Sequence, residues 1–243
     1  MTKFSRVTLQ PAYVIHSRAY RDTSLIVTAM SPEHGRVALV ARGAKSARSR
    51  NYALLQPFQP LLLSWSGQGE LMNLTAVEPQ GTAMALRGRA LVCGLYLNEV
   101  IVRCVHEAEG QIELFSQYDS ALRLLCGAAT DLQLQGVLRV FEIQLLDNLG
   151  YGLSLTYDVS GATVATDACY DYQMDRGPVP HAEPEIAGVR VSGRTLQVLA
   201  QGSLLEEVDP VVFKEAKTLL RYALSRLLGD KPLMSRELLR SSL

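Results

Sequence analysis

Hydrophobic and polar residues alternate in short runs over the first 80 residues, and glycine and proline separate the runs. The runs cover residues 7–17, 24–30, 36–42, 60–66 and 70–77, with turn residues between them that include Pro32, Gly35, Gly43, Gly67 and Gly69. Alternation with a period of two, bounded by turn residues, is typical of strands buried on one face. Five short strands in one compact unit predict a small closed β-barrel.

The period of two also assigns a face to each residue of the third run. One face carries Val37, Leu39 and Ala41, and the other carries Arg36, Val40 and Arg42. We therefore expect Arg36 and Arg42 to project together. The OB-fold is the commonest barrel of this size that binds single strands, so it is the predicted type.

From about residue 88 the apolar residues follow the period of a helix. They recur every three or four residues over 93–105, 115–126, 134–149 and 213–228, which is the stripe of a helix buried along one face. Gly150 is placed to end the third of these helices. Asp209 is a predicted N-cap before Pro210, and Gly229 and Pro232 end the last helix.

The segment between the third and the last helix is acidic and is interrupted by glycine and proline. We expect residues 151–190 to be an irregular insertion with a few short strands or turns. The prediction is an α+β protein with an OB-fold domain in residues 1–80 and a mainly helical domain in residues 81–243. The hydrophobic fraction of 48% supplies enough apolar side chains for packed cores.

The net charge of zero conceals an uneven distribution of charge. Residues 1–80 carry nine Lys and Arg against four acids, so the remainder of the chain is acidic. Residues 36–69 contain five basic residues and no acid. A basic patch on a neutral protein indicates a polyanion held at one place. The alternative is a solvated loop that arginines keep soluble, and the charge pattern alone does not decide between the two.

The basic loop that follows the third run has the residue types of a nucleic-acid contact. Residues 42–52 combine four cations with small residues and end on Tyr52. Cations neutralise phosphates and release counterions, while an aromatic ring can stack on any base. For Tyr52, as for Tyr13, Tyr20 and Trp65, a place in the barrel core or rim is the alternative. The residues expected to contact nucleic acid are Arg18, Arg21, Arg36, Arg42, Lys45, Arg48, Arg50 and Tyr52.

Motifs of catalysis and of metal binding are missing from the sequence. The segment 43–46 lacks the glycines of a phosphate-binding loop, and no Gly-x-Ser-x-Gly motif occurs. The four histidines are isolated, so metal binding through them is not expected. No catalytic nucleophile is expected among the cysteines, and the prediction is a protein that is not an enzyme and needs no cofactor.

The sequence also carries features that bear on the cellular compartment. The N-terminus lacks the features of a signal peptide, and no apolar run approaches the roughly 18 residues of a membrane span. We expect a cytoplasmic protein without a membrane partner, whose four cysteines (Cys93, Cys104, Cys126 and Cys169) are reduced and mostly small core residues.

Several short motifs, in their order and spacing, resemble the RecO family, particularly its gamma-proteobacterial type. In the first domain the resemblance is carried by residues 13–18, 23–25, 35–37, 41–46, 55–60 and 61–63. Further on it is carried by Gly94–Glu99, by the helix from Leu138 to Glu142 with the following Leu149–Gly152, and by Lys231–Leu238. The similarity spans nearly the whole chain.

The resemblance implies a DNA repair protein of the nucleoid that binds single- and double-stranded DNA and anneals complementary strands. It also implies partners: RecR, with which such a protein helps RecA load onto strands coated by single-stranded DNA-binding protein (SSB), and SSB itself. Many relatives carry a four-cysteine zinc site in the C-terminal part. Residues 151–180 contain Cys169 alone, so zinc is not expected here.

The resemblance further implies that the helical domain captures the acidic C-terminal tail of SSB, which ends in an aromatic residue and a free carboxylate. Such a ligand needs an apolar pocket and a fixed cation. Arg139, which lies beside Phe141, is the expected cation, with its guanidinium at the rim of the helical body. The alternative is that Arg139 pairs with Glu142.

Two other functions remain open at this point. One is an RNA-binding adaptor with the same kind of barrel, because stacking and phosphate contacts do not distinguish the two sugars. The other is an enzyme whose site no known motif reveals.

Overall fold

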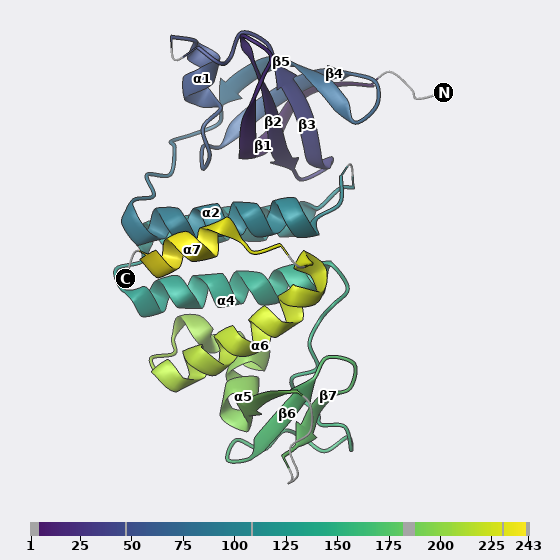
Figure 1. Ribbon diagram of the computed structural model, residues 1–243, viewed down its shortest axis with the longest axis vertical. Helices are drawn as coiled ribbons and strands as arrows, with labels where there is room; N and C mark the ends of the chain where they lie inside the picture. Colours follow the sequence, from purple (N-terminus) through teal and green to yellow (C-terminus); the bar gives the residue numbers. More distant parts are fainter. Residues whose placement is uncertain (1–4, 47, 108, 182–187, 230, 242–243) are drawn as a thin grey trace. The chain divides into compact units, whose positions relative to one another are not determined.

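The computed structural model describes residues 5–46, 48–107, 109–181, 188–229 and 231–241 (Figure 1). The chain divides into two compact units. The first unit consists of Met1–Cys126 and Leu233–Leu243, and the second of Gly127–Pro232. The second unit is thus an insertion between two parts of the first.

The first unit begins with the predicted barrel. Its strands are β1 (Ser5–Tyr20), β2 (Ser24–Ser31), β3 (Gly35–Ala41), β4 (Leu61–Gly67) and β5 (Leu71–Pro79). They close in the order β1-β2-β3-β5-β4, antiparallel except for the parallel pair of β3 and β5. The five strands predicted from the alternation are confirmed.

The interior of the barrel follows from the same alternation. Val37, Leu39 and Ala41 of β3 are buried, while Val40 and Arg42 are half-buried and exposed. Trp65 of β4 lies in the same core with 1% of its surface exposed. A full barrel core of this kind removes apolar surface from water, which is the main source of its stability.

A short helix, α1 (Arg50–Leu54), interrupts the basic loop between β3 and β4. The hydrophobic pattern gives no sign of it, because no residue of α1 is buried. Leu55, directly after it, is 1% exposed and anchors the loop in the barrel core.

Three helices complete the first unit: α2 (Gly88–Cys104), α3 (Ile112–Gly127) and α7 (Met234–Ser241). The first two were predicted from their apolar stripes. The last, α7, was not, because eight residues are too few for a clear period. It packs along α2, far from it in the sequence (Figure 1).

The second unit contains α4 (Asp131–Asn148), α5 (Gly193–Gln201), the 3-10 turn η1 (Ser203–Leu205) and α6 (Pro210–Leu228). The predicted ends of the helices are confirmed. Gly150 adopts a left-handed conformation directly after the C-cap of α4. Asp209 caps α6 by accepting a hydrogen bond from the backbone of Val211, and Gly229 ends that helix.

The insertion between α4 and α5 forms a small antiparallel sheet, where the glycine and proline interruptions predicted a few short strands or turns. Its strands β6 (Cys169–Gln173), β7 (Gly177–Pro180) and β8 (Val189–Ser192) take the order β7-β6-β8. A side-chain contact adds to the backbone ladders: Oδ2 of the buried Asp171 lies 2.7 Å from Nδ1 of His181, which follows β7.

Candidate nucleic-acid interface

A groove of about 530 Å³ opens where the β1–β2 turn meets the end of β3 and the start of β5. It is lined by Tyr20, Arg21, Asp22, Thr23, Ser24, Val40, Arg42 and Asn73. In an OB-fold the strand 2–3 face and the neighbouring loops are the part that binds oligonucleotides. The groove lies at that part of this barrel.

Arg42 is held at the edge of this groove by Asn73. The parallel pairing of β3 and β5 places Val40 opposite Asn73, and Arg42, directly after β3, reaches Asn73 from the same side. Nη2 of Arg42 donates a hydrogen bond of 3.1 Å to Oδ1 of Asn73. Arg42 as a whole is exposed. Sequence reasoning missed Asn73, because a single asparagine in a strand carries no signal until its partner is known.

The basic loop is fastened to the β1–β2 turn through Lys45. Its backbone N–H donates to the carbonyl of Thr23 at 3.0 Å, and its Nζ lies 3.5 Å from the carbonyl oxygen of Arg21. Arg21 in turn packs its guanidinium carbon 5.1 Å from the centre of the Tyr20 ring. Arg21, Arg42 and Lys45, which the sequence predicted as contacts, are therefore brought together.

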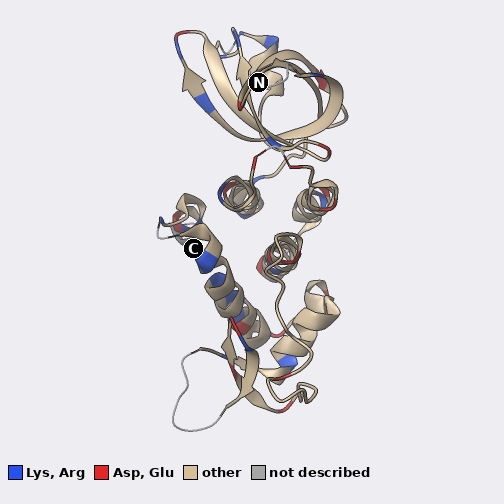
Figure 2. Ribbon diagram, turned by 90° about the vertical axis from the view of Figure 1, so that its right-hand side faces the viewer, with Lys and Arg blue, Asp and Glu red and all other residues tan. Residues whose placement is uncertain are grey.

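Most of the other predicted contacts lie exposed on the same barrel. Arg18 lies on β1, Arg48 and Arg50 lie at the start of α1, and Tyr52 on α1 is 38% exposed. Within the described ranges, none of Arg18, Arg42, Lys45, Arg48 and Arg50 has an acidic partner within 4.0 Å. Their charges are available to a ligand. Figure 2 shows the Lys and Arg of the barrel in blue.

The prediction that Arg36 and Arg42 project together is wrong. Its Nε donates to the carbonyl of Val105 at 3.0 Å, and Nη1 lies 3.3 Å from the carboxylate of Glu107. The two arginines share a face of β3 but lie six residues apart, which is about 20 Å in a strand. Arg36 joins the barrel to the segment after α2.

The aromatic residues divide between the core and the surface. Tyr13 and Trp65 are buried, and the Tyr13 hydroxyl donates to Asp119 of α3 at 2.5 Å. Tyr20 lines the groove and Tyr52 is exposed. For Tyr13 and Trp65 the alternative of a core position is therefore correct, and only Tyr20 and Tyr52 can meet a base.

The predicted position of Arg139 is also wrong, because its guanidinium does not emerge at the rim of the helical part. It is 5% exposed, and its Nη2 lies 2.6 Å from Oε1 of the fully buried Glu142. The alternative, an ion pair within α4, is the arrangement observed. Phe141 is 1% exposed and belongs to the core. Nε and Nη1 of Arg139 have no hydrogen-bond partner in the described part of the chain.

The described residues hold no group of three or more side chains that could bind a metal ion. Cys169 is exposed. In the same residues, no helix is long and apolar enough to cross a membrane.

Comparison with known proteins gives matches over nearly the whole chain. Residues 5–82 match the family model described as Recombination protein O N terminal, and residues 86–237 match Recombination protein O C terminal. The chain is 47% identical over 235 residues to the DNA repair protein RecO of Nitrosococcus oceani, covering 96% of this chain and 93% of that one.

Two further relatives extend this similarity. The DNA repair protein RecO of Coxiella burnetii is 43% identical over 240 residues, which cover 98% of this chain and all of that one. The protein of the same name from Chromobacterium violaceum is 40% identical over 245 residues, with 99% and 98% covered.

Proposed function

The chain belongs to the RecO family of DNA repair proteins, and we propose that it is a non-enzymatic recombination mediator that binds DNA on the outer face of its barrel. In this proposal it binds single- and double-stranded DNA, anneals complementary strands, and works with RecR to load RecA onto strands coated by SSB. It acts in the cytoplasm, at the nucleoid.

The observation that carries the proposal is the group of cations around one groove. Arg42, Lys45 and Arg21 converge through the contacts with Asn73 and Thr23. Each phosphate that a cation neutralises releases counterions, which drives binding in a sequence-independent way. Tyr20 at the groove and Tyr52 on α1 supply rings on which bases can stack.

The same charges offer a physical basis for annealing. Two complementary strands repel each other through their phosphates, and the repulsion must be reduced before bases can pair. Contacts to the backbone leave the pairing edges of the bases open. A cationic surface without base-specific contacts therefore suits a protein that brings any two complementary strands together.

The test is a charge-reversed variant in which Lys45, Arg48 and Arg50 are each replaced by Glu. With about four phosphate contacts the logarithm of affinity should fall with the logarithm of salt concentration with a slope of about −3 for single strands. In the variant we expect weaker binding of all sequences and a slope closer to zero by about 2. Fluorescence anisotropy with labelled oligonucleotides measures both.

The matched control is Arg176→Glu, which reverses an exposed charge in the turn between β6 and β7. It should leave the affinity and the slope unchanged. Equal affinity of the folded triple variant and the wild type would contradict the proposal. Oligonucleotides of equal sequence in DNA and RNA decide between a DNA-binding protein and the RNA-binding alternative.

The proposal includes the C-terminal tail of SSB as a ligand, with Arg139 as the cation for its free carboxylate. It is supported by the two N–H groups of the buried guanidinium that have no partner among the described residues, since unsatisfied buried donors are costly. Arg139 is 5% exposed, so in this proposal the guanidinium moves toward the surface when the carboxylate binds, and the pair with Glu142 competes with that movement.

Two variants therefore have opposite predicted effects on tail binding. Arg139→Ala should weaken binding of a tail peptide by about tenfold or more, because a hydrogen bond to a charged group is lost. Glu142→Gln removes the charge of the carboxylate that competes with the peptide for the Arg139 guanidinium, so it should tighten binding of the peptide. Calorimetric titration measures both. If the two variants lose affinity equally, Arg139 has a structural role and the tail binds elsewhere.

A further inference from the structure

A carboxylate of α2 binds the start of the C-terminal helix α7. Glu99 of α2 accepts hydrogen bonds from the backbone N–H groups of Met234 and Ser235, both at 2.9 Å, and from the Ser235 hydroxyl at 2.5 Å. The carboxylate thus binds N–H groups at the positive end of the α7 dipole. These contacts join residues 135 and 136 positions apart in the sequence.

A second contact supports the same docked position. The guanidinium carbon of Arg236 lies 5.8 Å from the centre of the Tyr96 ring, one turn of α2 before Glu99. Two sequence motifs that the proposed function does not use, Gly94–Glu99 and Lys231–Leu238, therefore meet each other.

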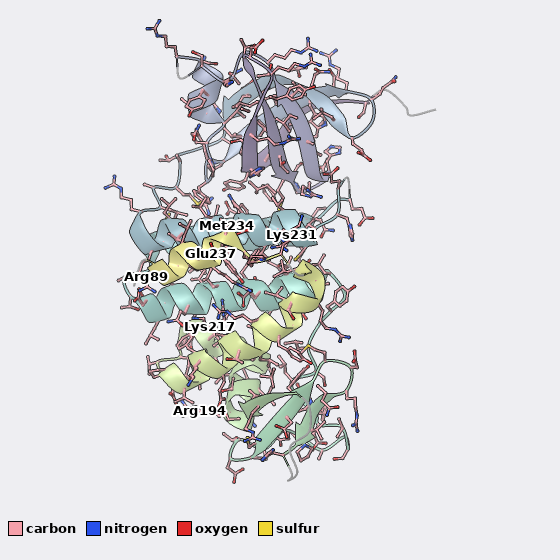
Figure 3. The ribbon with its side chains drawn as sticks, in the orientation of Figure 1. Arg89, Arg194, Lys217, Lys231, Met234 and Glu237 are labelled. Carbon is pink, nitrogen blue, oxygen red and sulfur yellow. The ribbon has the colours of Figure 1, made fainter. Side chains whose placement is uncertain are left out.

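Few of residues 233–239, for which the structure describes the exposure, are buried. Ser235 is 4% exposed and Leu233, directly before the helix, is 3% exposed. Met234 and Leu238 are 63% and 49% exposed, and Met234 and Glu237 can be found on α7 in Figure 3. A helix of eight residues is marginal in water without such support. α7 is therefore helical only while Glu99 and its neighbours hold it.

The path of the chain makes α7 one of two attachments between the units. The second unit leaves the first after Cys126 and returns to it at Leu233. While α7 is docked, the second unit is attached to the first at both of its ends. When α7 is released, only the attachment at residues 126–127 remains.

We propose that α7 docks reversibly on α2, with Glu99 as the residue that binds it. Release of α7 then allows the second unit to move relative to the first. The inference concerns neither the groove nor DNA affinity, so it does not depend on the proposed function. Elements with little buried surface open locally at a small fraction of the global unfolding free energy.

Hydrogen exchange on the full-length protein tests the first half of the proposal. In the wild type, amides of α7 should exchange faster than those of α2, while both are protected. Glu99→Gln keeps an acceptor but removes the charge, so α7 should exchange about tenfold faster or more, with α2 and the melting temperature nearly unchanged. Ser235→Ala should act in the same direction, more weakly.

The control is Glu113→Gln, which removes an exposed charge from the first turn of α3 in the same unit. It should leave exchange in α7 unchanged. Two results would contradict the reversible docking of α7. One is exchange in α7 that is as slow as in α2 and insensitive to Glu99→Gln. The other is equal acceleration throughout the first unit, because Glu99 would then be an ordinary part of its core.

A distance measurement tests the second half. Cys169 in the second unit is exposed and can carry a spin label, and Ser120→Cys on the exposed side of α3 carries the other in a Cys126→Ser background. Cys93 is buried, and burial raises the pKa of the Cys104 thiol to about 11, so neither should label well. The distance distribution should broaden in Glu99→Gln, and an unchanged distribution would show that α7 does not restrain the second unit.

Discussion

Arg139 and Glu142 form an ion pair of 2.6 Å within α4, and both residues are almost completely removed from solvent. Three positions apart on a helix, the two side chains are neighbours. Buried charges of this kind are expensive to desolvate and depend on each other for compensation.

Removing one member of this pair should therefore destabilise the protein. Arg139→Ala removes the cation that compensates the buried Glu142 carboxylate, and we expect a loss of about 3 kcal/mol or more in the free energy of unfolding. Replacing both residues by Leu should cost much less than either single change. Urea unfolding followed by circular dichroism gives the three values, and additive losses would contradict the pairing.

Arg36 of β3 and Arg42, directly after β3, should differ in their effect on DNA binding. Arg42→Ala removes a charge from the groove and should weaken DNA binding several-fold without changing stability. Arg36→Ala removes the contacts to Val105 and Glu107, so we expect a lower melting temperature and nearly normal affinity. Anisotropy titrations and thermal melts of the two variants test this contrast. Equal losses of affinity would place Arg36 in the interface.

The attachment of α7 should be sensitive to acid. Burial alone would raise the pKa of Glu99, but hydrogen bonds from Ser235 and Met234, together with the charge of Arg103, lower it overall. A lowered pKa means that the carboxylate stabilises docking fully above its unfolded value of about 4.3, and that this contribution is lost as the pH falls through the folded value. α7 should therefore be docked at pH 7 and loosen below about pH 4.

Nuclear magnetic resonance with a methyl label on Met234 follows this transition. The Met234 methyl signal should shift toward its random-coil position at a higher pH than the methyl signal of the buried Met30. In Glu99→Gln it should be near that position already at pH 7. Simultaneous changes of both methyl signals would indicate acid unfolding of the whole unit instead.

The purified protein should contain no stoichiometric zinc. Residues 151–180 offer one cysteine, and Nδ1 of His181 is engaged by Asp171 at 2.7 Å. A chelator should therefore leave the melting temperature unchanged, and elemental analysis should find far less than one zinc per chain. A content of about one zinc per chain would mean that other residues form a zinc site.

The sequence by itself determined the strands of the barrel, the longer helices and the charge of the loop after β3. Alternation located β1 to β5, because one buried face imposes a period of two on any strand. The ends of α4 and α6 could be predicted from Gly150 and from Asp209 with Pro210, since caps depend on a few adjacent residues. The cationic character of the loop after β3 was also evident, because charge is a property of composition.

Only the tertiary structure decided which of these residues act together. Arg36 pairs with Glu107, which is 71 positions away in the sequence, and Arg42 meets Asn73 only because β3 and β5 close the barrel. Glu99 binds Ser235, which lies 136 positions further along the chain. No local pattern records such pairs. Even Arg139, whose partner is three residues away, changed from an expected surface cation to a buried one, because burial depends on the elements that pack around a helix.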